Sequence, residues 1–255
     1  MRVDLVQMPI VWEDKAANLL YVEQLLQSSF QRPLAGESLI VLPEMFSTGF
    51  SMETSVTVDQ PEEGASAAMR AWALEHQSFL IGGCVLETGG EFENLAQTFS
   101  PSGETTGSYA KLQPFNFAGE GLAHRAGDEV TVLDISGVKV CPLICYDLRF
   151  PEHFRTGVDK GAEVFVVIAN WPERRESHWV KLLQARAIEN LAYVVGVNRV
   201  GTDPELSYSG RSLVVDPQGE IVLDCKSMEG LFSCDLDISA LREWRATFPA
   251  LRDKR

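Results

Sequence analysis

The chain has 255 residues, of which 45% are hydrophobic, so it is long and apolar enough to bury one large core. Its formal net charge of −14 argues against a general affinity for nucleic acid or acidic membranes, although local arginines can still hold an anionic substrate. Its five cysteines form no CxxC pair and it has only four histidines, so we expect neither a disulfide framework nor a metal site.

The order of the segments predicts one α/β domain over residues 1–255, because strand and helix patterns alternate along the chain. No signal peptide precedes the first strand and no apolar stretch reaches membrane-spanning length, so a cytoplasmic enzyme is expected. No phosphate-binding loop of the GxGxxG or GxxxxGK type follows a strand, so no cofactor is expected.

The N-terminal half is predicted to contain a strand over 2–9, a helix from Asp14 to about Ser28, a strand over 38–42, a helix opened by Pro61-Glu62-Glu63 and running to about Gln77, and a strand over 78–87. Turn signals at Gly89-Gly90 and near Gly103 separate two further strands, over 92–100 and up to Lys111. Consecutive strands joined by tight turns pair antiparallel, so part of the sheet is expected to be antiparallel.

Glu44 stands just beyond the strand over 38–42, which Pro43 ends. A carboxylate at the carboxyl end of a strand can project into the crevice where α/β proteins place their ligands. The apolar neighbours Met45 and Phe46 would desolvate it and favour its use as a general base, whereas a solvated loop glutamate is the alternative. Phe46 itself is a candidate for an apolar pocket wall or for plain core.

Lys111 ends the short strand that follows the turn near Gly103. Considered alone, it is an ordinary surface lysine. Residues 113–128 show no clear period and are predicted to form a long loop, and long loops in compact domains are often functional.

Cys145 follows an apolar run of strand type over 138–144, and the turn at Ser136-Gly137 joins that run to an earlier strand. A thiol at such a junction is held by a rigid element while its sulfur can face a cleft. A helix beginning soon afterwards would offer amide groups to a thiolate or an oxyanion. The alternative is a buried, inert cysteine, which is the commoner fate of a free thiol.

The C-terminal half is predicted to contain a helix from Pro151 to about Lys160, a strand over 164–169, a helix over 174–190, a strand over 191–198, a hairpin of strands over 209–216 and 220–235, and a short helix from about Ile238. Arg174 and Arg175 are expected to form a solvated helix start, with anion binding as the alternative. Arg186 and Glu189 are expected to form a buried structural pair.

Glu44, Lys111 and Cys145 and the motifs around them resemble the nitrilase, or carbon–nitrogen hydrolase, superfamily. The resemblance covers nearly the whole chain and is strongest within the bacterial omega-amidase branch. The motifs that carry it are Asp4-Leu5-Val6-Gln7-Met8-Pro9, Leu42-Pro43-Glu44, Tyr109-Ala110-Lys111, Ile144-Cys145-Tyr146-Asp147-Leu148-Arg149-Phe150-Pro151, Ala169-Asn170-Trp171-Pro172, Ala185-Arg186-Ala187-Ile188-Glu189-Asn190, Gly210-Arg211-Ser212 and Asp216-Pro217-Gln218-Gly219-Glu220.

This resemblance implies a four-layer α-β-β-α sandwich, with two mixed sheets face to face and helices outside. It implies a catalytic triad in which Cys145 is the nucleophile, Glu44 is the general base and Lys111 supports the reaction. Lys111 and the backbone amide of Tyr146 are the candidates for stabilising the oxyanion. Glu120, nine residues after Lys111, is expected to orient that lysine, with a surface loop carboxylate as the alternative.

The implied reaction is hydrolysis of the terminal amide of short α-keto dicarboxylic acid monoamides such as 2-oxoglutaramate, releasing ammonia through a thioester. The same triad could instead act on a carbamoyl amino acid, a deaminated peptide amide or a nitrile. Many relatives carry His-Leu-Phe after the lysine, whereas this chain has Leu112-Gln113-Pro114-Phe115, in which only Phe115 keeps its place.

Four further residues are candidates for substrate binding. Arg149 could hold a substrate carboxylate in a bidentate fork, or it could be a structural partner of Asp147. Asn170 and Trp171 end a strand and could line the pocket, although Trp171 could equally be core. Phe115 is a candidate for an apolar pocket wall.

Two other interpretations stay open. A Cys-His mechanism would need His124 or His178 to reach Cys145. A non-catalytic binding protein on the same fold is the alternative from another class. The partners expected are a small amide and water, and relatives imply at least a homodimer, formed through the outer helices at the apolar face of the helix that carries Trp179 and at the chain ends.

Overall fold

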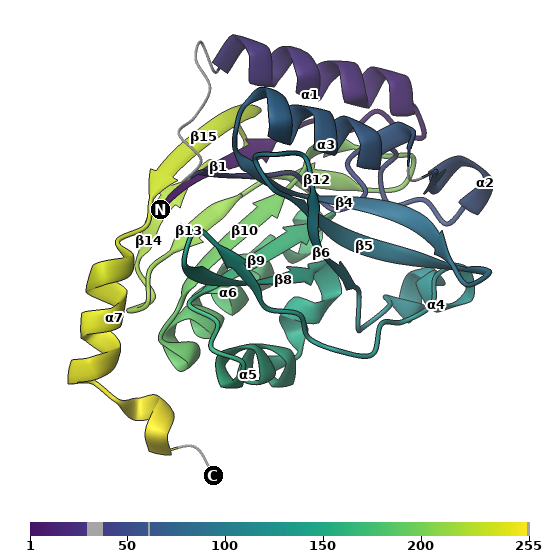
Figure 1. The fold of residues 1–255 in the computed structure, drawn as a ribbon. Helices are drawn as coiled ribbons and strands as arrows, with labels where there is room; N and C mark the ends of the chain where they lie inside the picture. Colours follow the sequence, from purple (N-terminus) through teal and green to yellow (C-terminus); the bar gives the residue numbers. More distant parts are fainter. Residues whose placement is uncertain (30–37, 61, 254–255) are drawn as a thin grey trace.

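The structure is a computed structural model that describes residues 1–29, 38–60 and 62–253 (Figure 1). Its first sheet has the order β15-β1-β2-β4-β5-β6, with β3 also paired to β4. Its members are β1 (Arg2–Gln7), β2 (Ser38–Val41), β3 (Val58–Asp59), β4 (Phe79–Thr88), β5 (Glu91–Phe99), β6 (Thr105–Ala110) and β15 (Gly230–Asp235). The strands β1, β2 and β4 are parallel, and β4, β5 and β6 are antiparallel, which confirms the predicted mixture.

The second sheet has the order β14-β13-β10-β9-β8-β7. Its members are β7 (Leu133–Ile135), β8 (Val138–Ile144), β9 (Val164–Ala169), β10 (Tyr193–Asn198), β13 (Leu213–Val215) and β14 (Ile221–Asp224). The central strands β8, β9 and β10 run parallel. β7 and β13 are antiparallel to their central neighbours β8 and β10, and β14 is antiparallel to β13. A separate hairpin is formed by β11 (Val200–Thr202) and β12 (Ser207–Ser209).

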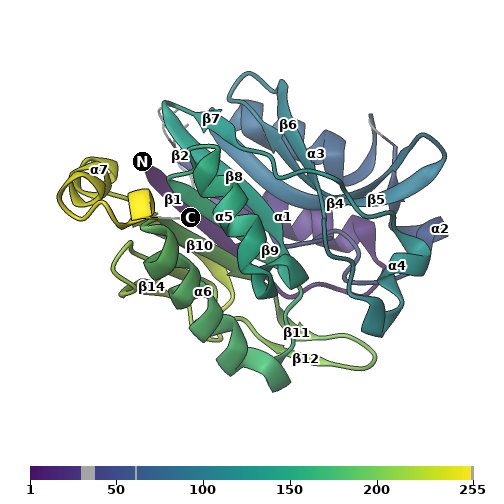
Figure 2. The ribbon, with the colours of Figure 1, turned by 90° about the horizontal axis from the view of Figure 1, so that it is seen from below.

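Helices cover the outer face of each sheet, so the layers are α-β-β-α as expected (Figure 1). The first sheet is covered by α1 (Lys15–Ser29) and α3 (Gly64–Glu75), and the second by α5 (Pro151–Asp159) and α6 (Glu176–Asn190), as both views show (Figures 1 and 2). The remaining helices are α2 (Thr54–Thr57), α4 (Glu120–Ala123) and α7 (Ile238–Thr247), which lies beyond the sheet edges (Figure 1).

The alternation of side chains along a strand explains why β2 is buried along its whole length. In and just after β2, Leu39 and Val41 point into the core between the sheets, whereas Ile40 and Leu42 point into the core beneath α1 and α3. Both faces are therefore buried, and the short apolar run before Glu44 belongs to the middle of the sandwich.

The start of α3 differs from the prediction. The helix begins at Gly64 and its first turn carries no acidic residue. The Asp59 carboxylate accepts a hydrogen bond from the Ala65 amide at 3.1 Å, so a side chain from the preceding strand satisfies this helix end. Pro61, which was predicted to open the helix, lies outside the described residues.

The predicted C-terminal hairpin is only half correct. β14 pairs with β13 as expected, but β15 leaves that sheet and pairs antiparallel with β1 in the other one. The crossing is fixed by Gln7, whose Nε2 donates to the carbonyls of Lys226 and Met228 at 3.0 and 2.6 Å. The segment 220–235, predicted as one strand, therefore contains two strands that belong to different sheets.

Three smaller differences concern helices. The long loop over 113–128 contains a 3-10 turn (Asn116–Ala118) and α4. The helix expected over 174–190 is a 3-10 turn (Glu173–Arg175) followed by α6. The apolar face of α6 is not free for a partner, because Trp179 is fully buried against its own sheet.

Candidate active site

Four strand ends from the two sheets meet at one place. Glu44 follows β2, Lys111 follows β6, Cys145 follows β8 and Asn170 follows β9. Asn170 joins the sheets, since its backbone N–H donates to Glu44 Oε2 at 2.9 Å and its Nδ2 donates to the Glu44 carbonyl at 2.7 Å. Residues that lie far apart in the sequence are therefore neighbours because strands of both sheets end there.

Buried charged side chains lie at the centre of this candidate active site. Lys111 Nζ donates to Glu44 Oε1 at 2.8 Å and to Glu120 Oε2 and Oε1 at 2.8 and 3.0 Å. Asn94 of β5 donates from Nδ2 to Glu44 Oε1 and Glu120 Oε1, at 2.8 and 2.9 Å. All four side chains are buried, so the two carboxylates are held by an ammonium and an amide with water excluded.

The pKa values follow from this arrangement. Burial works against the Lys111 charge, but the Glu120 and Glu44 carboxylates outweigh it and keep the pKa of Lys111 above its ordinary value. Burial also works against the charge of Glu120, but Lys111, the side chain of His124 and the Phe115 amide together lower the pKa of Glu120 to about 2. Lys111 and Glu120 are therefore both ionised at neutral pH.

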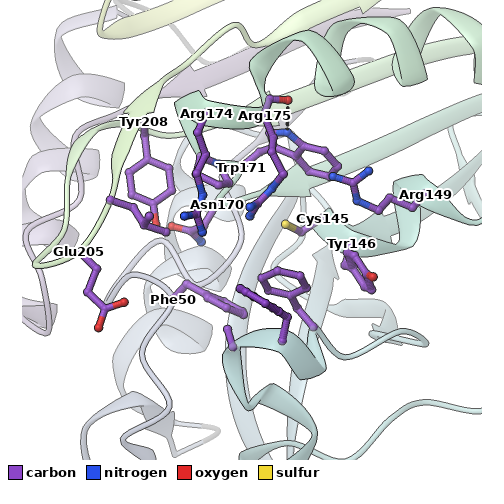
Figure 3. A pocket seen from close by; sticks show the side chains of 15 residues that line it. Phe50, Cys145, Tyr146, Arg149, Asn170, Trp171, Arg174, Arg175, Glu205 and Tyr208 are labelled. Atoms are coloured by element: carbon purple, nitrogen blue, oxygen red, sulfur yellow. Dashed lines mark hydrogen bonds between the residues drawn. The ribbon is translucent and has the colours of Figure 1, made fainter.

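Cys145 has φ +47°, in the left-handed region that non-glycine residues rarely adopt, directly after β8. This sharp turn directs its sulfur into a cavity (Figure 3). Burial and the Glu44 carboxylate raise the pKa of the Cys145 thiol well above its usual range, although the Lys111 ammonium lowers it in part. The thiol is therefore neutral at rest and needs a base before it can attack.

The cavity has a volume of about 150 Å³, and its wall is largely aromatic (Figure 3). It is lined by Phe50, Phe115, Phe117, Ala118, Cys145, Tyr146, Arg149, Asn170, Trp171, Pro172, Arg174, Arg175, Glu205, Leu206 and Tyr208. Phe115, Arg149, Asn170 and Trp171 are thus placed where the sequence predicted pocket residues.

Three arginines line the same cavity. Arg149 lies over the Trp171 ring at 4.8 Å, and Arg175 lies over the Phe115 ring at 5.5 Å. Burial, Arg174 and Arg149 lower the pKa of Arg175. Within the described residues none of these three arginines forms an ion pair. One acidic residue, Glu205, also lines the cavity, so its wall carries an excess of positive charge that suits an anion.

This arrangement corrects one expectation about arginines and removes one of the two alternatives left open for Arg149. Arg174 and Arg175 line the cavity and are not merely a solvated helix start. Arg149 is not the partner of Asp147, whose carboxylate accepts hydrogen bonds from the Tyr109 hydroxyl and two backbone amides.

Phe46 is a further correction. It is fully buried beneath α3, 6.1 Å from the Trp72 ring, and does not line the cavity. The reason is the left-handed conformation of Met45 (φ +42°), which turns the chain just after Glu44. Phe50, four residues further on, takes the position at the cavity and lies 5.0 Å from Lys111 Nζ.

The predicted structural pair is confirmed, since Arg186 Nη1 lies 3.0 Å from Glu189 Oε1. Neither histidine of the Cys-His alternative lines the cavity. His124 is buried with Nδ1 3.9 Å from Glu120 Oε1, and His178 lies on the outer side of Arg149, 3.4 Å from its Nη2.

The sequence analysis missed Asn94, Phe50 and the β11–β12 hairpin that supplies Leu206 and Tyr208 to the wall. Asparagine is uncommon inside strands, and that was the one available signal for Asn94. Nothing local marked the hairpin, because its role depends on where the second sheet places it.

Among residues 1–29, 38–60 and 62–253 no group of three or more acidic, histidine or cysteine side chains could hold a metal ion. Over the same residues, no helix combines the length and the apolar character that crossing a membrane requires.

Fold and site together define a hydrolase of carbon–nitrogen bonds in amides. The family model for carbon-nitrogen hydrolases matches residues 2–246, and the chain belongs to this family. It is 38% identical over 255 residues to omega-amidase YafV of Escherichia coli K12, covering 99% of this chain and 96% of that protein. It is 32% identical over 219 residues to 2-oxoglutaramate amidase of Bacillus subtilis 168, covering 85% of each.

Solved structures agree. XC1258 of Xanthomonas campestris, a CN-hydrolase superfamily protein with an arsenic adduct in its active site, superposes with a TM-score of 0.93 at 35% identity, over 100% of this chain and 97% of that one. A mutant amidase of Nesterenkonia sp. AN1, with acrylamide added at its active-site cysteine, gives a TM-score of 0.82 at 27% identity, over 98% of each.

Proposed function

We propose that this enzyme hydrolyses the terminal amide of short α-keto dicarboxylic acid monoamides such as 2-oxoglutaramate, giving 2-oxoglutarate and ammonia. The observation that carries the proposal is one cavity lined by the Cys145 thiol and by three arginines, which outnumber its one acidic residue, Glu205. The names of the relatives, omega-amidase and 2-oxoglutaramate amidase, support the same class of substrate.

In the first half of the reaction the substrate amide lies against Cys145. Glu44 takes the thiol proton as the sulfur attacks the carbonyl carbon, and it then passes that proton to the departing nitrogen. The carbon–nitrogen bond breaks, ammonia leaves, and the acyl group remains on sulfur as a thioester. A base is needed because the thiol is neutral at rest.

In the second half Glu44 takes a proton from water, and the resulting hydroxide attacks the thioester. The carbon–sulfur bond breaks, the proton returns to sulfur and the carboxylic acid leaves.

Both tetrahedral intermediates carry an oxyanion that needs donors. Lys111 has three N–H groups, of which one can serve Glu44 and one Glu120, so the third is available to the oxyanion. The backbone amide of Tyr146 is the second donor in this proposal, because it follows the left-handed residue Cys145.

The arginines bind the far end of the substrate. Arg149 and Arg175 can hold the α-carboxylate in charge-assisted hydrogen bonds, and their stacking on Trp171 and Phe115 fixes the planes of the guanidinium groups. Glu120 keeps Lys111 oriented and does not touch the leaving group. The aromatic wall leaves room for a short chain between the two ends.

The test is ammonia release from 2-oxoglutaramate by the purified protein, beside Cys145→Ala and with asparagine, glutamine and simple nitriles as comparison substrates. We expect fast release from the keto acid amide alone, and none in the variant. Selective alkylation of Cys145 by iodoacetamide without release would reject this substrate and favour another carbon–nitrogen compound. Release that persists in Cys145→Ala would contradict the mechanism.

We further propose that residues 1–255 act as one carbon–nitrogen hydrolase domain and that the enzyme is cytoplasmic. The meeting of both sheets at a single site supports the first statement.

A further inference from the structure

Asp147 is fully buried two residues beyond Cys145, and its carboxylate accepts three hydrogen bonds. Oδ2 accepts from the Tyr109 hydroxyl at 2.7 Å and from the Ile144 amide at 2.9 Å, and Oδ1 accepts from the Gln113 amide at 2.9 Å. The mechanism proposed above makes no use of this carboxylate.

The donors come from the two segments that carry the reacting groups. Ile144 directly precedes Cys145, whereas Tyr109 and Gln113 flank Lys111, two residues away on either side. The Tyr109 hydroxyl also accepts from the Leu112 amide at 3.3 Å. One carboxylate therefore joins the end of β8 to both sides of the lysine.

The turn at Cys145 needs such support. A non-glycine residue in the left-handed region costs on the order of 1 to 3 kcal/mol and persists only where its surroundings impose it. The Asp147 carboxylate accepts a hydrogen bond from the Ile144 amide and thereby links the two sides of the turn at Cys145.

We propose that Asp147 and Tyr109 form a clamp that positions the Lys111 ammonium against the Cys145 thiol. Neither clamp residue touches the substrate. The clamp acts on the proposed reaction through Lys111 and Cys145, and the inference rests on the catalytic roles proposed for those two residues.

The charge of Asp147 strengthens the clamp, because hydrogen bonds to an ionised acceptor are stronger than those to a neutral one. Burial raises the pKa of Asp147 to about 7, and the Ile144 amide, Lys111 and the Tyr109 hydroxyl offset it only in part. The other titratable group that faces it is Cys141 of β8, which burial keeps as a thiol. The clamp therefore loosens as pH falls below about 7.

The experiment compares Tyr109→Phe, Asp147→Asn and the double variant with the wild-type enzyme. Tyr193→Phe is the matched control, because it removes a buried hydroxyl of β10 that interacts with the backbone of Asp237, away from the cavity. For each protein we would measure kcat and KM across pH, the alkylation rate of Cys145 by iodoacetamide, and Tm.

We expect Tyr109→Phe to lower kcat by roughly 10- to 100-fold, the effect of a small misplacement of reacting groups, with KM changed less than about threefold. Asp147→Asn should lower kcat further and lose the acidic limb of the kcat profile near pH 7. The double variant should be no slower than Asp147→Asn, because both changes break the same clamp. Tyr193→Phe should lower only Tm.

Two outcomes would overturn the clamp. One is that Tyr109→Phe lowers Tm as the control does while kcat and the alkylation rate stay within about twofold of wild type. The other is additive losses in the double variant. If Asp147→Asn does not fold, Tyr109→Phe decides alone. The alkylation rate needs no amide substrate, so it tests the clamp even if 2-oxoglutaramate proves inert and the proposed function fails.

Discussion

The Cys145 thiol sits beside a carboxylate that raises its pKa and an ammonium that lowers it, and the net result is a neutral thiol. Many reactive cysteines are thiolates at rest, whereas the proposed mechanism deprotonates this thiol as it attacks. In that mechanism Glu44 takes the thiol proton, so we expect turnover to depend on Glu44.

The first prediction at this scale concerns the nucleophile. Cys145→Ala should reduce ammonia release by at least about 10³-fold, because no other group in the cavity can form the thioester. Tm should stay close to that of the wild-type enzyme, since the change removes one sulfur from a cavity wall. Circular dichroism and kinetics on the same preparation measure both effects.

The second prediction concerns Asn94, which donates to Glu44 and Glu120 from one Nδ2, while its Oδ1 has no hydrogen-bond partner among the described residues. Asn94→Asp would replace that donor by a third carboxylate beside two others. We expect kcat to fall by roughly 10²-fold or more, because the variant loses the amide donor to both glutamates and a third buried carboxylate would compete for Lys111.

Asn190→Asp is the matched control for this change. Asn190 is buried in α6, and its Nδ2 donates to the Arg186 carbonyl. Its Oδ1 also lacks a hydrogen-bond partner in the part of the chain that the structure describes. The Asn190→Asp variant should be less stable than the wild-type enzyme and should keep its kcat. Equal kcat losses in both variants would show that any buried aspartate disturbs the enzyme and that Asn94 has no special role.

The third prediction concerns the arginines. Arg149→Gln should raise KM for 2-oxoglutaramate by roughly 10- to 100-fold, the effect of losing a charge-assisted contact to a carboxylate. KM for a neutral amide of similar length should stay nearly unchanged. Arg70→Gln, which removes the same charge on α3 far from the cavity, controls for net charge. Equal KM increases for charged and neutral amides would contradict carboxylate binding.

At the scale of elements, the strand β4 shows how closely the sheet approaches the site. An added Cβ at Gly83 would lie 2.4 Å from the Met45 amide nitrogen and 2.5 Å from Glu44 Cα, both backbone atoms. At the adjacent Gly82 the nearest atom would be the sulfur of Met69, the end of a flexible side chain. The two glycines face opposite sides of the strand.

The fourth prediction follows from this contrast. Gly83→Ala should lower kcat by at least about tenfold, because the segment carrying Glu44 must shift. Gly82→Ala should lower Tm with little effect on kcat, since Met69 can move. Kinetics and thermal unfolding of the two variants test this prediction. A Gly83→Ala enzyme with normal kcat would show that the segment carrying Glu44 can shift without a loss of activity.

At the scale of the whole molecule, buried charges make stability depend on pH. The pKa of Glu120 is lowered from 4.5 to about 2 in the fold, so this group stabilises the native state above about pH 4.5. As pH falls toward 2 the contribution is lost, and its size is on the order of 3 kcal/mol. The buried charges of the site are therefore also part of what stabilises the fold.

The fifth prediction uses Glu120→Gln, which preserves shape and removes the charge. The difference in unfolding free energy between wild type and variant should be constant above pH 5 and should shrink as pH approaches 2. Urea unfolding at several pH values measures it. A difference independent of pH would contradict the lowered pKa, and unchanged kinetics would remove Glu120 from the site.

The homodimer remains a prediction from the family resemblance. Trp179 is used by the core, but Ile188 on α6 and Phe248 after α7 are half exposed and lie on the outer helices and near the C-terminus. Light scattering of the purified protein measures the subunit number, and a monomer at micromolar concentration would reject this expectation.

The sequence by itself determined the order and kind of most elements, because strand and helix patterns are local properties of the chain. Local patterns offered Glu44 and Cys145 as candidates beside inert alternatives, and Lys111 joined them only through the resemblance of its motif to the family. The resemblance to the family supplied the layered sandwich, which the structure confirms.

Only the tertiary structure decided which side chains meet. Four findings depend on contacts between distant segments. They are the crossing of β15 to the first sheet, the burial of Phe46, the placement of Arg174 and Arg175 in the cavity wall, and the contact of Asn94 with two carboxylates. A local pattern gives the spacing of residues along one element, whereas the position of that element against another is fixed by packing of the complete core.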